Sequence, residues 1–167
     1  MRFVLREWTK KDVHSVAKHA NNKSIEKNLR ASFPHPYTLE DAEEYIDMCA
    51  NADKTKSLCR CVDVNGGAVG SIGVFLLDDV YCKSAEIGYW LSQDYWGMGI
   101  MTKAVSEICE IAFKELDIVR IQACVFGFNK GSMKVLSKAG FDLEGILKKS
   151  IYKDGQIHDS YMYAKTR

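Results

Sequence analysis

The chain has 167 residues, and 23 Lys and Arg against 22 Asp and Glu give it a formal net charge of +1. Hydrophobic residues make up 47% and charged residues 27%, which excludes wholesale disorder and is enough to build the core of one domain over residues 1–167. The balanced charge argues against a polybasic nucleic-acid binder, whose affinity depends on surplus positive charge.

In chain order, the first expected element is a strand over residues 3–7. A helix then runs to Ala20, with Thr9 as its N-cap. After a break at Pro34-His35-Pro36, a second helix starts at Thr38, and its apolar residues recur at helical spacing as far as Cys49.

In the middle and at the end of the chain, several segments have the residue pattern of strands. Strands over 57–64 and 69–76 flank the turn Asn65-Gly66-Gly67, which is a strong hairpin signal. The remaining expected elements are a strand over 84–91, a helix over 97–116, a strand over 120–126, a helix over 130–139 and a closing hairpin of 141–152 with 157–163. Hairpins interrupted by single crossover helices predict an α+β fold with a mixed sheet.

Several features bear on cellular location and metal binding. The longest apolar run, Gly67–Leu77, is about half of the ~20 residues that a membrane-spanning helix needs. The N-terminus is too charged for a secretory signal. The six cysteines include no CxxC pair, so we expect reduced thiols instead of a metal site or a disulfide framework. These features predict a cytoplasmic protein without a membrane partner or a metal.

The most informative segment is the turn Gly97-Met98-Gly99, which lies between an expected strand and an expected helix. The first N–H groups of a helix lack internal partners and lie at the positive end of its dipole, and glycines let a phosphate approach them closely. The turn is therefore a candidate pyrophosphate site, although the same pattern also forms ordinary tight turns. It lacks the Lys-Ser/Thr of a Walker motif and the third glycine of a dinucleotide-binding motif.

Three more residues have both a structural and a functional interpretation. Gly88, inside a strand, marks a bulge, a close approach of another chain or only a packing requirement. Asn129 has the position of a helix N-cap. Ser132, one turn further, has the position of a solvated or back-bonded hydroxyl.

Together these segments resemble the GNAT superfamily of acyl-CoA N-acyltransferases, and within it the RimJ/RimL-like branch. The resemblance covers nearly the whole chain, through Leu5-Arg6-Glu7, Phe33-Pro34, Glu86-Ile87-Gly88-Tyr89, Tyr95-Trp96-Gly97-Met98-Gly99, Asn129-x-x-Ser132, Gly140-Phe141 and Tyr152-Lys153-Asp154-Gly155. Two positions depart from it. Asp94 stands where the superfamily favours Arg or Gln, and Met101-Thr102-Lys103 where the branch often has Ala-Thr-Glu.

The resemblance implies a mostly antiparallel sheet whose two central strands splay apart at a bulge beside Gly88, with the pantetheine arm of acetyl-CoA in the gap. It implies that backbone amides hold the pyrophosphate, namely those of Trp96, Gly97, Met98, Gly99, Ile100 and Met101. It further implies that Tyr89 and Leu91 line the pantetheine path, that Asn129 hydrogen-bonds this arm, and that Lys134 pairs with a cofactor phosphate.

The implied reaction is direct attack by a neutral amine on the acetyl thioester. Near pH ~7.5 an α-amino group with a pKa of about 7.8 is roughly one-third neutral, whereas a lysine side chain near 10.4 is only about 0.1% neutral. An enzyme for α-amines therefore needs only a modest base. Glu86 is the predicted base, directly or through a water, and the alternative is an outward-facing strand carboxylate.

The leaving thiolate needs a proton or a hydrogen-bond donor. Ser132 matches the serine at this place in RimJ/RimL-like enzymes, and the tyrosine that other GNAT enzymes carry further along this helix is absent. The leading hypothesis is thus an acetyl-CoA-dependent N-acetyltransferase of a protein N-terminal α-amine on a ribosomal-protein-like acceptor. The alternatives are an acetyltransferase of a small amine (polyamine, amino acid or aminoglycoside) and a non-catalytic acyl-CoA-binding regulatory module. Monomer and homodimer both stay open.

Overall fold

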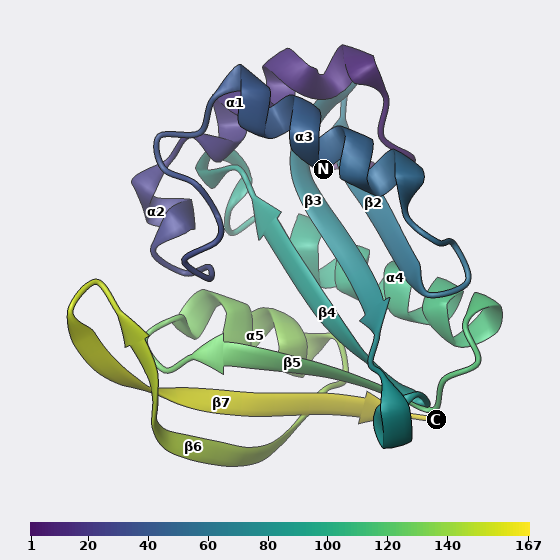
Figure 1. Ribbon diagram of the computed structural model, residues 1–167, viewed down its shortest axis with the longest axis vertical. Helices are drawn as coiled ribbons and strands as arrows, with labels where there is room; N and C mark the ends of the chain where they lie inside the picture. The colour runs from purple at the N-terminus through teal and green to yellow at the C-terminus, as the bar shows by residue number, and fades with distance from the viewer.

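Seven strands form one mixed sheet in the computed structural model, which describes residues 1–167 (Figure 1). The spatial order is β1-β2-β3-β4-β5-β7-β6, and only β4 and β5 run parallel. The strands are β1 (Val4–Arg6), β2 (Ser57–Val64), β3 (Gly67–Leu76), β4 (Ser84–Leu91), β5 (Arg120–Phe126), β6 (Asp142–Lys153) and β7 (Gln156–Thr166). This arrangement confirms the predicted α+β class with a mostly antiparallel sheet.

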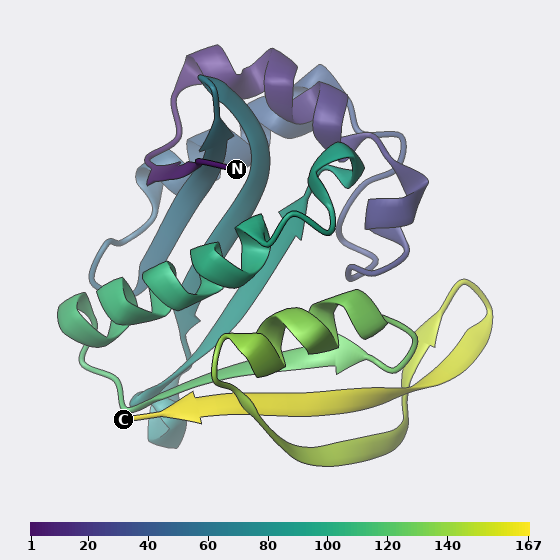
Figure 2. The same ribbon diagram turned by 180° about the vertical axis from the view of Figure 1, so that it is seen from behind.

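Helices cover both faces of the sheet (Figures 1 and 2). On one face lie α1 (Val13–Ala20), α2 (Lys23–Glu26) and α3 (Leu39–Asn51), and on the other α4 (Ile100–Glu115) and α5 (Lys130–Lys138). Short 3-10 turns span Lys10–Asp12, Asp79–Tyr81 and Gln93–Tyr95. None of the helices combines the length and the apolarity that crossing a membrane requires.

Local sequence signals account for most element boundaries. Thr9 forms a capping box with Asp12, and Thr38 forms one with Asp41 at the start of α3. The helix predicted from residue 97 begins only at Ile100, because Gly97 and Gly99 have φ values of 76° and 75° in the left-handed region. The predicted helix over 9–20 is divided into a 3-10 turn and α1.

Two hydrophobic clusters make up the core, one on each face of the sheet. The larger has 26 buried residues and includes the inner face of α4, whereas the smaller has 12 and joins α1 and α3 to the sheet. Strand β4 contributes to both, since Ala85, Ile87 and Leu91 belong to the larger cluster and Trp90 to the smaller. Alternate side chains of β4 therefore point to opposite faces.

The sheet is split between β4 and β5. The two strands pair only over Ser84–Glu86 with Arg120–Gln122. Beyond Glu86, β4 pairs with β3 alone as far as Leu91, and β5 pairs with β7 alone as far as Phe126. The predicted splay is thus present. The predicted bulge beside Gly88 is wrong, because the β3–β4 register runs unbroken through Gly73 and Gly88. The divergence needs no extra residue, since each strand follows its own antiparallel neighbour.

Candidate functional site

The turn before α4 presents a row of unpaired backbone donors. Between residues 97 and 102, no backbone N–H donates to a backbone carbonyl, and the first helical bond runs from Lys103 to Gly99 at 3.3 Å. A Cβ added to Gly97 or Gly99 would meet no atom within 4 Å. Free donors, the positive end of a 16-residue helix and open space above the glycines fit an anionic group such as a phosphate.

Not every residue predicted at this turn offers a free group. The Trp96 amide donates to the Gln93 carbonyl at 3.1 Å, and the Trp96 indole donates to the Leu91 carbonyl at 2.8 Å, which ties the turn to the end of β4. The side chains of Leu91, Ile100 and Met101 are buried in the larger core cluster. Ile100 and Met101 therefore offer only their backbone amides.

The start of α5 faces the split from the β5 side. The Asn129 side chain accepts a hydrogen bond from the Ser132 amide at 3.1 Å, so the helix-cap interpretation of Asn129 is confirmed. Its side-chain nitrogen makes no hydrogen bond to the protein and stays available. Lys134 is exposed on the same helix and forms no ion pair.

A hydrogen bond crosses the split between β4 and α5. The hydroxyl oxygens of Tyr89 and Ser132 lie 2.7 Å apart. Burial raises the pKa of the Tyr89 phenol well above its usual range, so this group stays protonated and is a permanent donor. If Tyr89 donates to Ser132, the Ser132 proton is free for another acceptor. This contact between residues far apart in the sequence was not predicted, because Tyr89 was expected only to line the pantetheine path.

Glu86 occupies the opposite face of β4 from Tyr89. Its side chain is 29% exposed, and Oε1 accepts a hydrogen bond from the Arg30 guanidinium at 2.5 Å. Gly88, on the same face, is exposed, and a Cβ there would meet nothing within 4 Å. Glu86 is also the last residue of β4 that pairs with β5. The carboxylate therefore lies at the apex of the split and beside open space.

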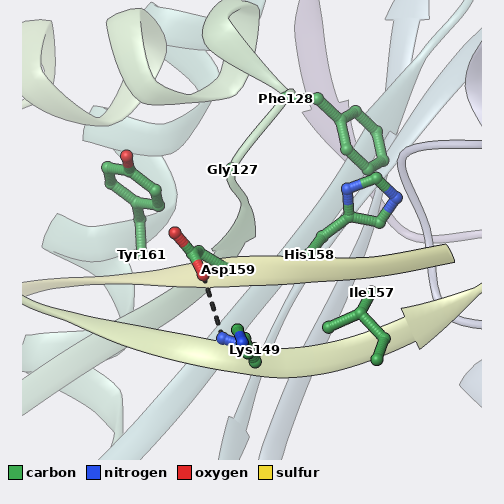
Figure 3. Close-up of a pocket in the computed structure, with 7 residues that line it drawn as sticks. All are labelled: Gly127, Phe128, Lys149, Ile157, His158, Asp159 and Tyr161. Atoms are coloured by element: carbon green, nitrogen blue, oxygen red, sulfur yellow. Dashed lines mark hydrogen bonds between the residues drawn. The ribbon is translucent and has the colours of Figure 1, made fainter.

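A separate cavity of about 690 Å³ lies between the β5–α5 turn and the β6–β7 hairpin (Figure 3). Phe128 and His158 meet edge to face there, with ring centroids 4.8 Å apart. Asp159 accepts a hydrogen bond from the Lys149 amide at 2.9 Å. The lining residues are Gly127, Phe128, Lys149, Ile157, His158, Asp159 and Tyr161. None of the predicted site residues lines this cavity, although Phe128 directly precedes Asn129.

Comparisons with known proteins agree with one another. The family model described as acetyltransferase (GNAT) domain matches residues 2–142. The "Probable N-acetyltransferase YjcK" of Bacillus subtilis is 41% identical over 96 residues, which are 58% of this chain and 53% of that protein. The match thus spans about half the length of that relative. The "Uncharacterized N-acetyltransferase YoaA" of the same bacterium is 33% identical over 166 residues, 98% of this chain and 92% of that protein.

A solved structure gives a further comparison. RimL, described as a ribosomal L7/L12 alpha-N-protein acetyltransferase in complex with coenzyme A, superposes with a TM-score of 0.85 at 22% sequence identity. The superposition covers 98% of this chain and 93% of that one. At this identity the likeness shows a shared fold.

Proposed function

The chain belongs to the acetyltransferase (GNAT) domain family, and from this premise we propose that it transfers the acetyl group of acetyl-CoA to a primary amine. The observation that carries the proposal is the split between β4 and β5, which begins at Glu86 and has a different set of polar groups on each side. Residues 1–167 form one catalytic domain in this proposal, and the domain acts in the cytoplasm.

The chain holds acetyl-CoA mainly through its backbone. The amides of residues 97–101 bind the pyrophosphate, because they are unpaired and the glycines leave room for it. The free side-chain nitrogen of Asn129 donates to the pantetheine arm, Tyr89 and Leu91 border its path, and the exposed Lys134 pairs with a phosphate. Trp96 and Met98, both a little under half exposed, supply apolar surface beside the turn.

Acetyl-CoA supplies an acetyl thioester whose sulfur leaves as a thiolate. Ser132 keeps its proton and donates a hydrogen bond from its hydroxyl to the departing thiolate, and Tyr89 donates a hydrogen bond to Ser132 in turn across their 2.7 Å contact. Because the Tyr89 phenol has a raised pKa, it holds the Ser132 hydroxyl in the donating orientation over the whole neutral range. Tyr89 is thus a positioning residue, and Ser132 is the catalytic donor.

Glu86 receives the proton of the acceptor amine, directly or through a water. It lies at the apex of the split and on the face with open space at Gly88, so an amine can approach the carboxylate from that side. General-base assistance is worth most for amines that are protonated at neutral pH.

We further propose that the acceptor is a protein N-terminal α-amine. The shared fold with RimL and the modest base that an α-amine needs support this choice. A small-molecule amine is the second candidate, since one fold serves many acceptors. A panel of peptides with free N-termini, spermidine and free amino acids, followed by thiol release, separates the two.

An acetyl-CoA titration by calorimetry tests the cofactor site. We expect saturable binding to the wild-type chain and its loss in Gly99→Leu, whose side chain would enter the space above the free amides. Gly66→Leu is the matched control, because Gly66 also has a positive φ (85°) and open space but lies in the β2–β3 turn. A folded wild-type chain that does not bind acetyl-CoA would overturn the proposal. Binding without thiol release across the panel would favour the non-catalytic module.

A further inference from the structure

The segment from α2 to Arg30 contacts both halves of the split sheet. On the β6 side, the Lys153 ammonium donates to the Glu26 carbonyl at 2.6 Å and to the Leu29 carbonyl. On the β4 side, Arg30 donates to Glu86. Residues 26–30 therefore bridge the tip of the β6–β7 hairpin and the apex of the split, on the face away from α4 and α5 (Figure 1).

The two ends of this bridge differ in burial. The side chains of Lys153 and Glu26 are 7% and 9% exposed, and their charged atoms lie 3.1 Å apart. A buried pair with additional carbonyl acceptors is costly to break and therefore persistent. Arg30 is 73% exposed and Glu86 29% exposed, and pairs of this kind are weak and exchange readily with other ions. The bridge is fixed at Lys153 and releasable at Glu86.

Resting on the proposed role of Glu86 as the proton acceptor, we infer that Arg30 occupies the place of the substrate's ammonium group and is displaced when the amine binds. The guanidinium donates an N–H to the carboxylate oxygen, which is the same interaction that a protonated amine would make. While the guanidinium donates to Oε1, that oxygen is occupied and cannot accept from an amine at the same time. The amine therefore binds Glu86 only after Arg30 has left.

The inference also narrows the class of acceptor. Displacing a guanidinium from a carboxylate requires a competing cation, so the amine arrives protonated and becomes neutral at Glu86. The open space at Gly88 and the aromatic pair of Phe33 and Trp90, with centroids 6.2 Å apart, lie on this face of the sheet. They favour a primary ammonium group with a small apolar neighbour.

Steady-state kinetics with alaninamide as the acceptor test the inference. In Arg30→Gln, the KM for alaninamide falls by about two- to fivefold, as expected for loss of an exposed competing ion pair, while the KM for acetyl-CoA stays unchanged. Lys27→Gln is the matched control, because Lys27 is an exposed cation on the same segment that forms no ion pair. Methylguanidinium should then compete with alaninamide in Arg30→Gln, where the position is vacant, more strongly than in the wild type.

An unchanged or higher KM for alaninamide in Arg30→Gln would overturn the inference, and so would an equal decrease in Lys27→Gln. Calorimetric binding of alaninamide to the chain saturated with coenzyme A separates this inference from the proposed function, because it requires no turnover. Tighter binding by Arg30→Gln than by the wild type supports displacement even if alaninamide is not acetylated. Equal or weaker binding contradicts displacement, even if the wild type acetylates other amines.

Discussion

The two faces of β4 meet different environments within a few residues. Toward α4 and α5, Ile87 and Leu91 are buried in the larger core cluster, and the only polar group is the Tyr89 phenol bonded to Ser132. Toward α2 and the loop after it, Glu86 is partly solvated, Gly88 is open, and the hydrogen-bonding partner of Glu86 is the exposed guanidinium of Arg30. The face toward α4 and α5, called the neutral face below, thus carries an uncharged hydrogen bond within a buried surface. The face toward α2, called the charged face, carries an ion pair that is open to solvent.

This difference matches what the two halves of an acetyl transfer require. A departing thiolate is stabilised best by donors that are already oriented in a water-poor site, because no reorganisation is then needed during the reaction. An incoming ammonium must instead lose its hydration, bind, and give up a proton. A solvated carboxylate with a releasable partner allows these steps. Glu86 and Tyr89 lie close together in the sequence, but successive side chains of a strand point to opposite faces, which separates the roles proposed for the two residues.

Glu86→Gln should have the largest effect on activity, because it removes the carboxylate from the charged face of β4. We expect kcat/KM near neutral pH to fall by about 10²- to 10⁴-fold, the contribution of a general base. The deficit should shrink as the pH rises past the amine pKa of about 8 for an α-amine, because the amine is then neutral without assistance. A pH–rate profile of both proteins measures this change.

Glu110→Gln is the control for the loss of one negative charge, since Glu110 is exposed on α4 and forms no ion pair. Its pH–rate profile should match that of the wild type. Profiles for Glu86→Gln that run parallel to the wild type at all pH values would exclude Glu86 as the base.

Ser132→Ala and Tyr89→Phe test the neutral face. Ser132→Ala should lower kcat by about 10²-fold and Tyr89→Phe by about tenfold, at the low end of acid–base contributions because a thiolate is a fair leaving group. The KM for acetyl-CoA should change little in either. If Tyr89 acts through Ser132, the double variant loses no more activity than Ser132→Ala alone.

Independent losses that multiply in the double variant would contradict this coupling and would assign Tyr89 a separate role. A raised KM for acetyl-CoA in Tyr89→Phe, with kcat unchanged, would limit Tyr89 to lining the cofactor path. The second result would make Tyr89 part of a binding surface only, whereas the first would leave the neutral face catalytic.

The sequence predicts the strands, the long helices and the glycine turn, because each has a local signal such as a capping residue, an Asn-Gly turn or a hydrophobic period. It does not predict α2, whose four residues Lys23–Glu26 are too few to show a helical period. The contacts of Arg30 with Glu86 and of Tyr89 with Ser132 join residues 56 and 43 positions apart. Such pairs depend on how the split sheet places its two halves, which no local pattern encodes.

Two glycines that pair across β3 and β4 test, with the smallest expected effects, whether the charged face of β4 is open to an acceptor. Gly73 pairs with Gly88 in the ladder, but a Cβ on Gly73 would meet the Phe75 ring at 2.7 Å, whereas a Cβ on Gly88 would meet nothing within 4 Å. Gly73→Ala should therefore lower the free energy of unfolding by about 1–3 kcal/mol through overpacking. Gly88→Ala should leave stability unchanged or raise it by up to ~1 kcal/mol, because alanine loses less entropy in a strand.

The two variants should exchange places in kinetics: Gly88→Ala, which keeps its stability, should change the KM for the amine, and Gly73→Ala, which loses stability, should not. In Gly88→Ala the added methyl enters the space beside Glu86, so the KM for the amine should rise a few-fold, less than the roughly tenfold or more that one methylene is worth in a tight pocket. In Gly73→Ala the methyl lies under the Phe75 ring, and the KM for the amine should stay near the wild-type value. Chemical denaturation and amine titrations of both variants measure these effects. A destabilised Gly88→Ala with an unchanged KM would mean that this face of β4 is occupied by the protein itself, leaving no room there for an acceptor.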